Sequence, residues 1–116
     1  MIQVKDSSIR FHDIVPEMVI AIMVVDQVLY ERGVPCVITS ANDGGHSAAS
    51  LHYSRQGKHS DLKCRAVDVR SKYPVLDGRE VEVKEEIKRR LGKHYDVLIE
   101  AAGTDNEHFH IEWDPK

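Results

Sequence analysis

The sequence predicts an α+β fold in which two main helices accompany a small, mostly antiparallel sheet. Two observations support this fold class. Apolar residues recur at helical spacing in two segments, and short runs rich in β-branched residues, bounded by turn residues, indicate strands. The resulting order of helix, strand, strand, helix, strand, strand is typical of an α+β chain. The 116 residues fit one domain, residues 1–116.

Both helices have residues suited to their ends. Pro16 suits the first position of the first helix, and Gly33 suits the position just beyond its end. The second helix is expected over 80–91, with Gly92 as its stop. Each helix carries one apolar stripe, formed by Met18, Ile22, Val25 and Leu29 in the first and by Val83, Ile87 and Leu91 in the second.

Strands are expected where short β-branched or alternating runs lie between turn residues. These runs are residues 1–4, 9–11, 34–40, 65–70, 95–101 and 108–113. Small and polar residues predict loops over 41–50 and 53–64, and turns over 74–78 and 103–106. In the strand 65–70, Ala66 and Asp68 share one face while Val67 and Val69 share the other.

Composition and charge exclude several classes of protein. Sixteen Lys and Arg against nineteen Asp and Glu give a net charge of −3, so nothing indicates a nucleic-acid partner. The longest apolar run, 19–25, is far below the ~18 residues that span a bilayer, and no secretory signal is visible. We therefore expect no membrane partner, a monomer, and a cytoplasmic protein at synthesis. Cys36 and Cys64 are expected to be free thiols.

The run HFHIEW carries the strongest chemical signal. In a strand, His108, His110 and Glu112 share one face, whereas Phe109 and Ile111 point to the other and can fill a core. Catalytic zinc takes three protein ligands from His, Asp or Glu and keeps one position for water. A nearby carboxylate must then accept the proton of that water. The HFHIEW run therefore predicts part of a metal or acid–base site.

Further donors for this site must come from elsewhere in the chain. Asp68 on its short strand and His52 before the polar loop are the candidate ligands. Two carboxylates are candidates for the base. Glu107 lies three residues before His110, and Glu100 ends the preceding strand.

At these residues the sequence resembles the M15-type zinc peptidases. The resemblance rests on Ser50-Leu51-His52-Tyr53, on Arg65-Ala66-Val67-Asp68 and on Glu107-His108-Phe109-His110, and it extends over about 39–114. The group includes D-alanyl-D-alanine dipeptidases and carboxypeptidases, L-alanyl-D-glutamate endopeptidases of phage lysins, and the related signalling domain of hedgehog proteins. The resemblance implies the hedgehog and D-Ala-D-Ala-peptidase type of fold.

The resemblance also implies roles for individual residues. By position, His52, Asp68 and His110 match the three zinc ligands. Glu107 matches the general base, and His108 matches a second histidine that steadies the intermediate or shuttles protons. The remaining matches lie around the substrate: His46 at the rim of the site, Ser50 in support of the loop that carries His52, and Arg70 or, alternatively, Arg10 for the substrate carboxylate.

Two departures from the family pattern leave alternatives open. Fifteen residues lie between His52 and Asp68, more than in the family, so His59 is the alternative ligand to His52. The family's glycine before the R-A-x-D stretch is replaced by Cys64. The stretch AAGTDN before Glu107 is also longer than in close relatives, which leaves Glu100 as the alternative base.

The expected function is zinc-dependent hydrolysis of peptide bonds in the D-amino-acid-containing stem peptides of peptidoglycan. Carboxypeptidase, endopeptidase and dipeptidase activity all stay open, and a phage-encoded protein would act on the cell wall. The alternative is a zinc-stabilised binding or structural module without turnover. A fourth protein ligand, such as Cys64 or His59, would favour that alternative, because structural zinc sites are normally closed.

Overall fold

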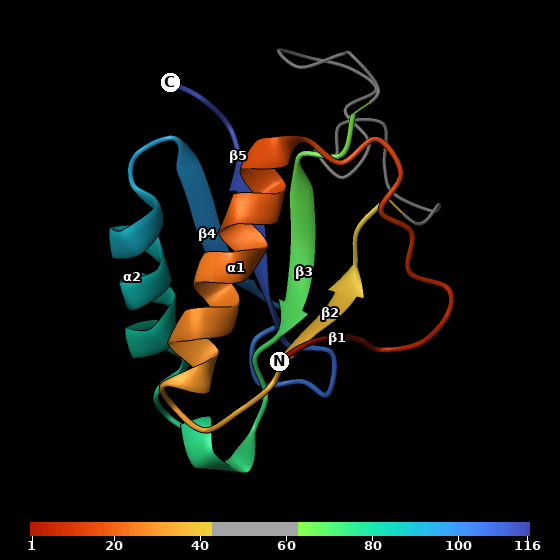
Figure 1. Ribbon diagram of the computed structural model, residues 1–116. Coiled ribbons are helices and arrows are strands. Elements are labelled where there is room, and N and C mark those ends of the chain that lie inside the picture. Colours follow the sequence, from red (N-terminus) through yellow and green to blue (C-terminus); the bar gives the residue numbers. More distant parts are fainter. Residues whose placement is uncertain (43–62) are drawn as a thin grey trace.

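The computed structural model describes residues 1–42 and 63–116, and these ranges form an α+β fold (Figure 1). Five strands pair into one sheet of order β1-β2-β3-β5-β4. Strand β1 runs parallel to β2, and the other neighbours are antiparallel. The elements, in chain order, are β1 (Ile2–Val4), α1 (Pro16–Tyr30), β2 (Cys36–Ser40), β3 (Ala66–Arg70), the 3-10 turn η2 (Pro74–Leu76), α2 (Glu80–Leu91), β4 (Tyr95–Glu100) and β5 (His108–Trp113). The predicted fold class is confirmed.

Both helices end at the glycines that the sequence indicated. Gly33 has a φ of 77°, its N–H donates to the Tyr30 carbonyl, and the next N–H, of Val34, reaches back to the Leu29 carbonyl. These two bonds form a Schellman ending, which satisfies carbonyls at the end of α1. Gly92 ends α2 with a φ of 88°.

The prediction of a strand over 9–11 is wrong. This segment has no strand partner in the described residues. One backbone bond, from the Asn42 N–H to the Arg10 carbonyl (2.7 Å), ties it to the end of β2. The Arg10 guanidinium turns back and donates to the carbonyls of Ser7 and Ile9, so the chain curls locally instead of extending along the sheet.

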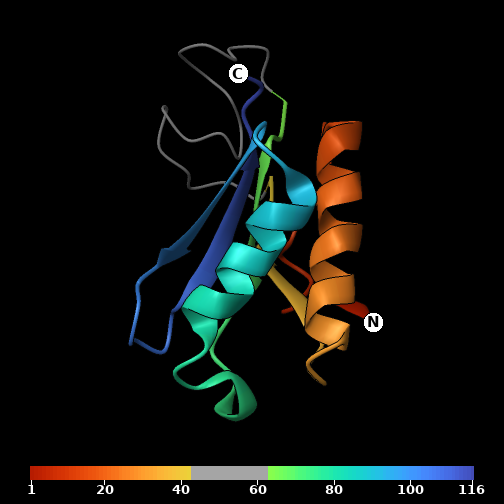
Figure 2. The same ribbon diagram turned by 90° about the vertical axis from the view of Figure 1, so that its left-hand side faces the viewer.

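Helices α1 and α2 cover the same face of the sheet (Figures 1 and 2). Their buried stripes meet Val67, Val69, Phe109 and Ile111, which occupy alternate positions of β3 and β5 and are fully buried. Burying such alternate side chains is the main driving force for docking helices on a sheet. The other face of β3 and β5 carries polar side chains.

Two further expectations can be compared with the structure. Cys36 and Cys64 are not joined by a disulfide, in agreement with the predicted free thiols, and both are buried. In the described ranges, no helix combines the length and the apolar character needed to cross a bilayer; the longer helix, α1, has 15 residues.

Candidate metal centre

The polar face of the sheet gathers titratable side chains across three neighbouring strands. The register places Asp68 of β3 directly opposite His110 of β5, and it places Glu100 of β4 opposite His108. Directly opposed residues on antiparallel strands have Cβ atoms about 5 Å apart, close enough for their side chains to interact. Strand pairing alone therefore brings both histidines of HFHIEW to a carboxylate.

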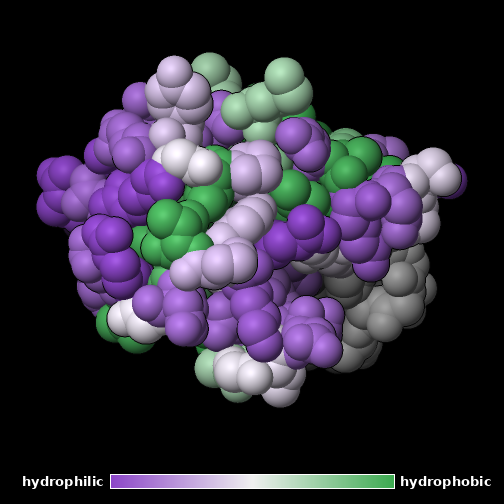
Figure 3. Space-filling model, turned by 90° about the horizontal axis from the view of Figure 1, so that it is seen from below, coloured by the Kyte–Doolittle hydropathy of each residue, from purple (hydrophilic) through white to green (hydrophobic). Residues whose placement is uncertain are grey.

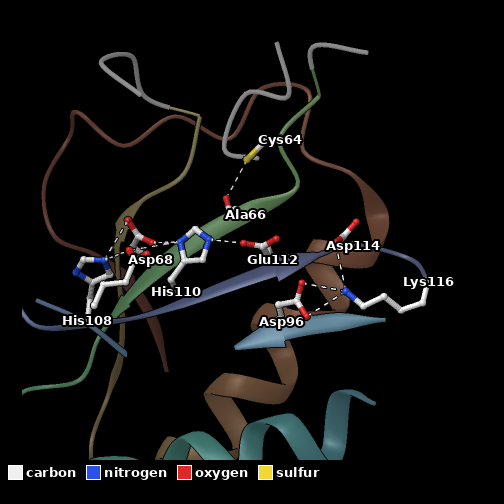
Figure 4. Close-up of polar contacts among 10 residues, drawn as sticks. Cys64, Ala66, Asp68, Asp96, His108, His110, Glu112, Asp114 and Lys116 are labelled. Atoms are coloured by element: carbon white, nitrogen blue, oxygen red, sulfur yellow. Dashed lines mark hydrogen bonds and ion pairs between the residues drawn. The ribbon is translucent and has the colours of Figure 1, made fainter. Parts of the chain in front are cut away.

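The side-chain contacts join these four residues into one cluster. Asp68 Oδ1 lies 2.9 Å from His110 Nδ1, and Glu100 Oε1 lies 2.9 Å from His108 Nε2. Longer contacts cross-link the two pairs, because Asp68 Oδ2 is 3.7 Å from His108 Nε2 and Glu100 Oε1 is 3.8 Å from His110 Nδ1. Figure 4 shows His108, Asp68 and His110 side by side over β3 and β5. We call Asp68, Glu100, His108 and His110 the histidine–carboxylate cluster.

The donor atoms of this cluster suit a metal ion. One ligand atom from each of Asp68, Glu100 and His108 lies within 4.8 Å of the other two. Imidazole nitrogen and carboxylate oxygen are donors that zinc takes in catalytic sites. His108 Nδ1 lies 2.8 Å from the Asn106 carbonyl, which can only accept a hydrogen bond. His108 Nε2 in turn lies 2.9 Å from Glu100 Oε1, so both ring nitrogens face acceptors, and a metal ion at Nε2 would leave the ring proton on Nδ1.

His110 is held between two carboxylates in the metal-free chain. Its Nδ1 faces Asp68, and its Nε2 lies 2.9 Å from Glu112 Oε1. Burial by itself disfavours the imidazolium, but the hydrogen bonds to Asp68 and Glu112, with the charges of Asp68 and Glu100, outweigh burial and raise the pKa of His110 to about 10. A metal ligand must be a neutral imidazole. His110 therefore joins a metal site only by giving up its proton.

Glu107, the residue matched to the base, lies apart from this cluster. It immediately precedes His108, so the alternation of the strand turns it to the other side. Its Oε2 accepts a hydrogen bond from Ser71 Oγ (2.7 Å), and its Oε1 accepts one from the Gly103 N–H (3.1 Å). Among the candidates for the base, Glu100 is the carboxylate that the structure brings to the histidines. The alternation of HFHIEW already separated Glu107 from His108, but the pairing of Glu100 needed the hairpin register.

The candidates for substrate binding fall in different places. Arg70 lies opposite His108 and lines a hollow of about 240 Å³ beside the cluster, together with Lys5 and Lys72. Arg10 instead donates to backbone carbonyls of its own segment. Sequence reasoning did not identify Lys5 as part of this hollow, and no motif marks it. Four candidates from the sequence lie outside the described residues: His46, Ser50, His52 and His59.

Two other groups near the cluster have partners of their own. The Cys64 thiol donates to the Ala66 carbonyl over 3.2 Å, and Cys64 is absent from the groups of described residues that could hold a metal (Figure 4). Asp96, Glu112 and Asp114 also lie close together. The Lys116 ammonium reaches Asp96 (3.1 Å) and Asp114 (3.2 Å) and so supplies positive charge to that acidic group.

Comparisons of the chain with family models, with curated proteins and with solved structures find no match in any of the three. The function proposed below is therefore inferred from the residues and geometry of the chain itself.

Proposed function

We propose that this chain is a zinc peptidase that hydrolyses peptide bonds in the D-amino-acid-containing stem peptides of peptidoglycan. The observation that carries the proposal is the histidine–carboxylate cluster, in which two histidines and two carboxylates from three strands lie within contact distance. Asp68 and His110, with His52 from outside the described residues, would hold the zinc. Zinc bound there would polarise the scissile carbonyl and lower the pKa of a water to about 7.

Glu100 is the general base in this proposal. Its side chain is 45% exposed, so water and substrate can reach it, whereas both oxygens of Glu107 are already hydrogen-bonded. A base must lie within hydrogen-bond reach of the proton that it accepts. Glu100 would take the proton of the attacking water and deliver it to the leaving amine.

His108 would work together with Glu100. Its Nε2 lies 2.9 Å from Glu100 Oε1 and 3.7 Å from Asp68 Oδ2, and its Nδ1 lies 2.8 Å from the Asn106 carbonyl, which orients the ring. Once Glu100 takes the proton of the attacking water, the Nε2–H that faced this carboxylate would be available to donate a hydrogen bond to the developing oxyanion.

Arg70 would hold a carboxylate of the substrate. Its guanidinium lines the hollow beside His108 and is solvent-exposed, and Lys5 adds a second positive charge there. Arginine binds carboxylates through two parallel hydrogen bonds, which fixes the orientation of the bound group. Stem peptides carry carboxylates close to their D-amino acids, so this hollow would place the scissile bond against the cluster.

The proposal is tested by cleavage of defined muropeptides. The full chain is loaded with zinc and incubated with stem peptides, and products are read by mass spectrometry. Wild type is expected to release products whose cut site distinguishes carboxypeptidase, endopeptidase and dipeptidase activity. Glu100→Gln is expected to lose about 10²- to 10⁴-fold in kcat, the usual contribution of a general base. A chain that holds one zinc and releases no product would refute the peptidase.

A second function is favoured by the number of donors in the cluster. Asp68, Glu100 and His108 place ligand atoms within 4.8 Å of one another, and His110, 2.9 Å from Asp68, would supply a fourth side chain once it loses its proton. Four protein ligands are typical of a closed, structural zinc site. Such a chain would be a zinc-stabilised binding module without turnover. Cobalt substitution separates the two functions, because added anions or water analogues change the visible spectrum of an open site and leave that of a closed four-ligand site unchanged.

A further inference from the structure

Glu107 is a largely buried ionisable residue, 9% exposed, that the mechanism above does not use. It connects two parts of the fold. Glu107 Oε2 accepts a hydrogen bond from the hydroxyl of Ser71, the residue that follows β3. Glu107 Oε1 accepts a hydrogen bond from the N–H of Gly103, which lies in the turn between β4 and β5. A carboxylate with two hydrogen bonds of this kind ties the β4–β5 turn to the end of β3.

That turn carries a member of the histidine–carboxylate cluster at each end. Glu100 precedes it and His108 follows it. Ala101, the first residue of the turn, has a φ of 53°, a conformation that a residue with a Cβ adopts only where its surroundings hold it. Thr104 supplies part of that hold, because its N–H and its Oγ1 both donate to the Ala101 carbonyl, over 3.1 and 2.7 Å.

The turn also supplies a contact of the His108 ring. The Asn106 carbonyl, which lies 2.8 Å from His108 Nδ1, belongs to the residue before Glu107, and the Glu107 N–H donates to the Thr104 carbonyl over 3.2 Å. Displacing Glu107 therefore displaces the carbonyl that His108 Nδ1 contacts. Figure 3, which shows the molecule from below, presents a mostly hydrophilic surface with separate hydrophobic patches.

We propose that Glu107 is a positioning residue that braces the β4–β5 turn against the end of β3. The brace keeps Glu100 2.9 Å from His108 Nε2 and the Asn106 carbonyl 2.8 Å from His108 Nδ1. Its effect on turnover rests on the proposed peptidase function, but its effect on the turn does not. Glu107 acts through hydrogen bonds that it accepts, and its negative charge takes no part in the chemistry.

Substitutions at both ends of the brace separate positioning from base catalysis. Glu107→Gln can keep both contacts, because the amide oxygen accepts from the Gly103 N–H while the amide NH₂ donates to Ser71 Oγ. Glu107→Ala removes both contacts, and Ser71→Ala removes one neutral donor while leaving the carboxylate in place. Asp105→Asn is the matched control, since Asp105 lies in the same turn with a fully exposed side chain.

The first readout is hydrogen exchange of the Gly103 amide in the metal-free full chain, measured by NMR, because this N–H donates to Glu107 Oε1. Wild type, Glu107→Gln and Asp105→Asn are expected to protect the Gly103 amide from exchange. Ser71→Ala, and Glu107→Ala where it folds, are expected to exchange it faster. Gly103 exchange at the wild-type rate in folded Ser71→Ala and Glu107→Ala would overturn the proposal.

The second readout is turnover of the zinc-loaded chain. Glu107→Gln and Asp105→Asn are expected to retain kcat within about threefold of wild type, and Ser71→Ala to lose about 10- to 100-fold, as is usual for residues that orient a functional side chain. A folded Glu107→Gln protein that is inactive while Ser71→Ala is active would overturn the proposal and return Glu107 to the role of base. A wild-type chain without turnover would refute the peptidase alone, because the exchange readout requires neither zinc nor substrate.

Discussion

Replacing Asp68 with Asn is expected to destabilise the metal-free chain in a pH-dependent way. Asp68 Oδ1 accepts the His110 Nδ1 proton at 2.9 Å, and both side chains are largely shielded from solvent. The substitution keeps the shape of the side chain and a neutral oxygen acceptor but removes the negative charge. The change therefore probes the charge of Asp68 against the imidazolium of His110.

The size of the expected loss of stability follows from the contacts between His110 and its carboxylates. The pKa of His110 rises from 6.5 to about 10, which corresponds to about 5 kcal/mol of free energy between its two protonation states. This free energy is what remains after the opposing effect of burial, and it is shared among Asp68, Glu112 and Glu100. A hydrogen bond to a charged group contributes about 1.5–3 kcal/mol and a neutral one about 1 kcal/mol. Replacing the charged acceptor of Asp68 with the neutral acceptor of Asn should therefore lower the free energy of unfolding by about 1 kcal/mol.

The sign of the pH dependence follows from linkage. Because the folded pKa of His110 lies above its unfolded value, the stabilisation is fully present below about pH 6.5 while the carboxylates stay ionised, and it is lost as the pH rises through about 10. Urea unfolding in EDTA at about pH 6 and above about pH 10 measures the free energy of unfolding where the stabilisation is present and where it is lost. The loss of stability in Asp68→Asn should be about 1 kcal/mol at the lower pH and should shrink at the higher pH. An equal deficit at both would refute the charge-pair reasoning, and Asp105→Asn serves as the exposed control.

Three further predictions concern the thiols, the core and the substrate. Burial, with a smaller contribution from the charge of Asp26, raises the pKa of the Cys36 thiol to about 12, so iodoacetamide at pH 8 should alkylate Cys36 only after unfolding, as mass spectrometry of the intact chain can show. Phe109→Ala should lower the free energy of unfolding by about 3–5 kcal/mol in urea titrations, because Phe109 is fully buried under the helices. Arg70→Ala should raise the KM for carboxylate-bearing stem peptides about tenfold with little change in kcat, whereas Arg10→Ala, which removes a guanidinium that donates to the Ser7 and Ile9 carbonyls, should leave both unchanged.

Much of the candidate site could be predicted from the sequence because the strand period is two. Alternation in HFHIEW and in RAVDVR placed both histidines and Asp68 on polar faces opposite apolar ones, and the two strands do pair with Asp68 beside His110. The helices could be predicted for the same kind of reason, since apolar stripes and terminal glycines are local signals. These local signals predict the structure because side chains repeat with a fixed period in strands and in helices.

The rest of the candidate site depends on how strands pair, which the residues of one segment do not determine. Whether Glu100 meets His108 is decided by the register of the β4–β5 hairpin, and a turn of seven residues does not fix that register in the way that a two-residue turn does. The false strand at 9–11 arose because alternation alone does not show whether a segment pairs with a neighbouring strand; within the described residues, the Asn42 N–H to Arg10 carbonyl bond ties this segment to the end of β2. Glu107 was matched to the base by its spacing from His110, although its adjacency to His108 already placed it on the opposite side of the strand.

The charges of the cluster explain why a proton and a divalent cation would compete for it. Asp68, Glu100 and Glu112 surround two imidazoles, and three carboxylates so close together repel one another unless positive charge lies between them. In the metal-free chain the proton of His110 provides that charge, and the same carboxylates hold the proton there. A divalent cation offers more charge to the same oxygens and takes the imidazole nitrogen in its neutral form. The pairing that stabilises the metal-free fold is therefore the arrangement that a zinc ion would replace, and the strand registers keep the donors in place in either state.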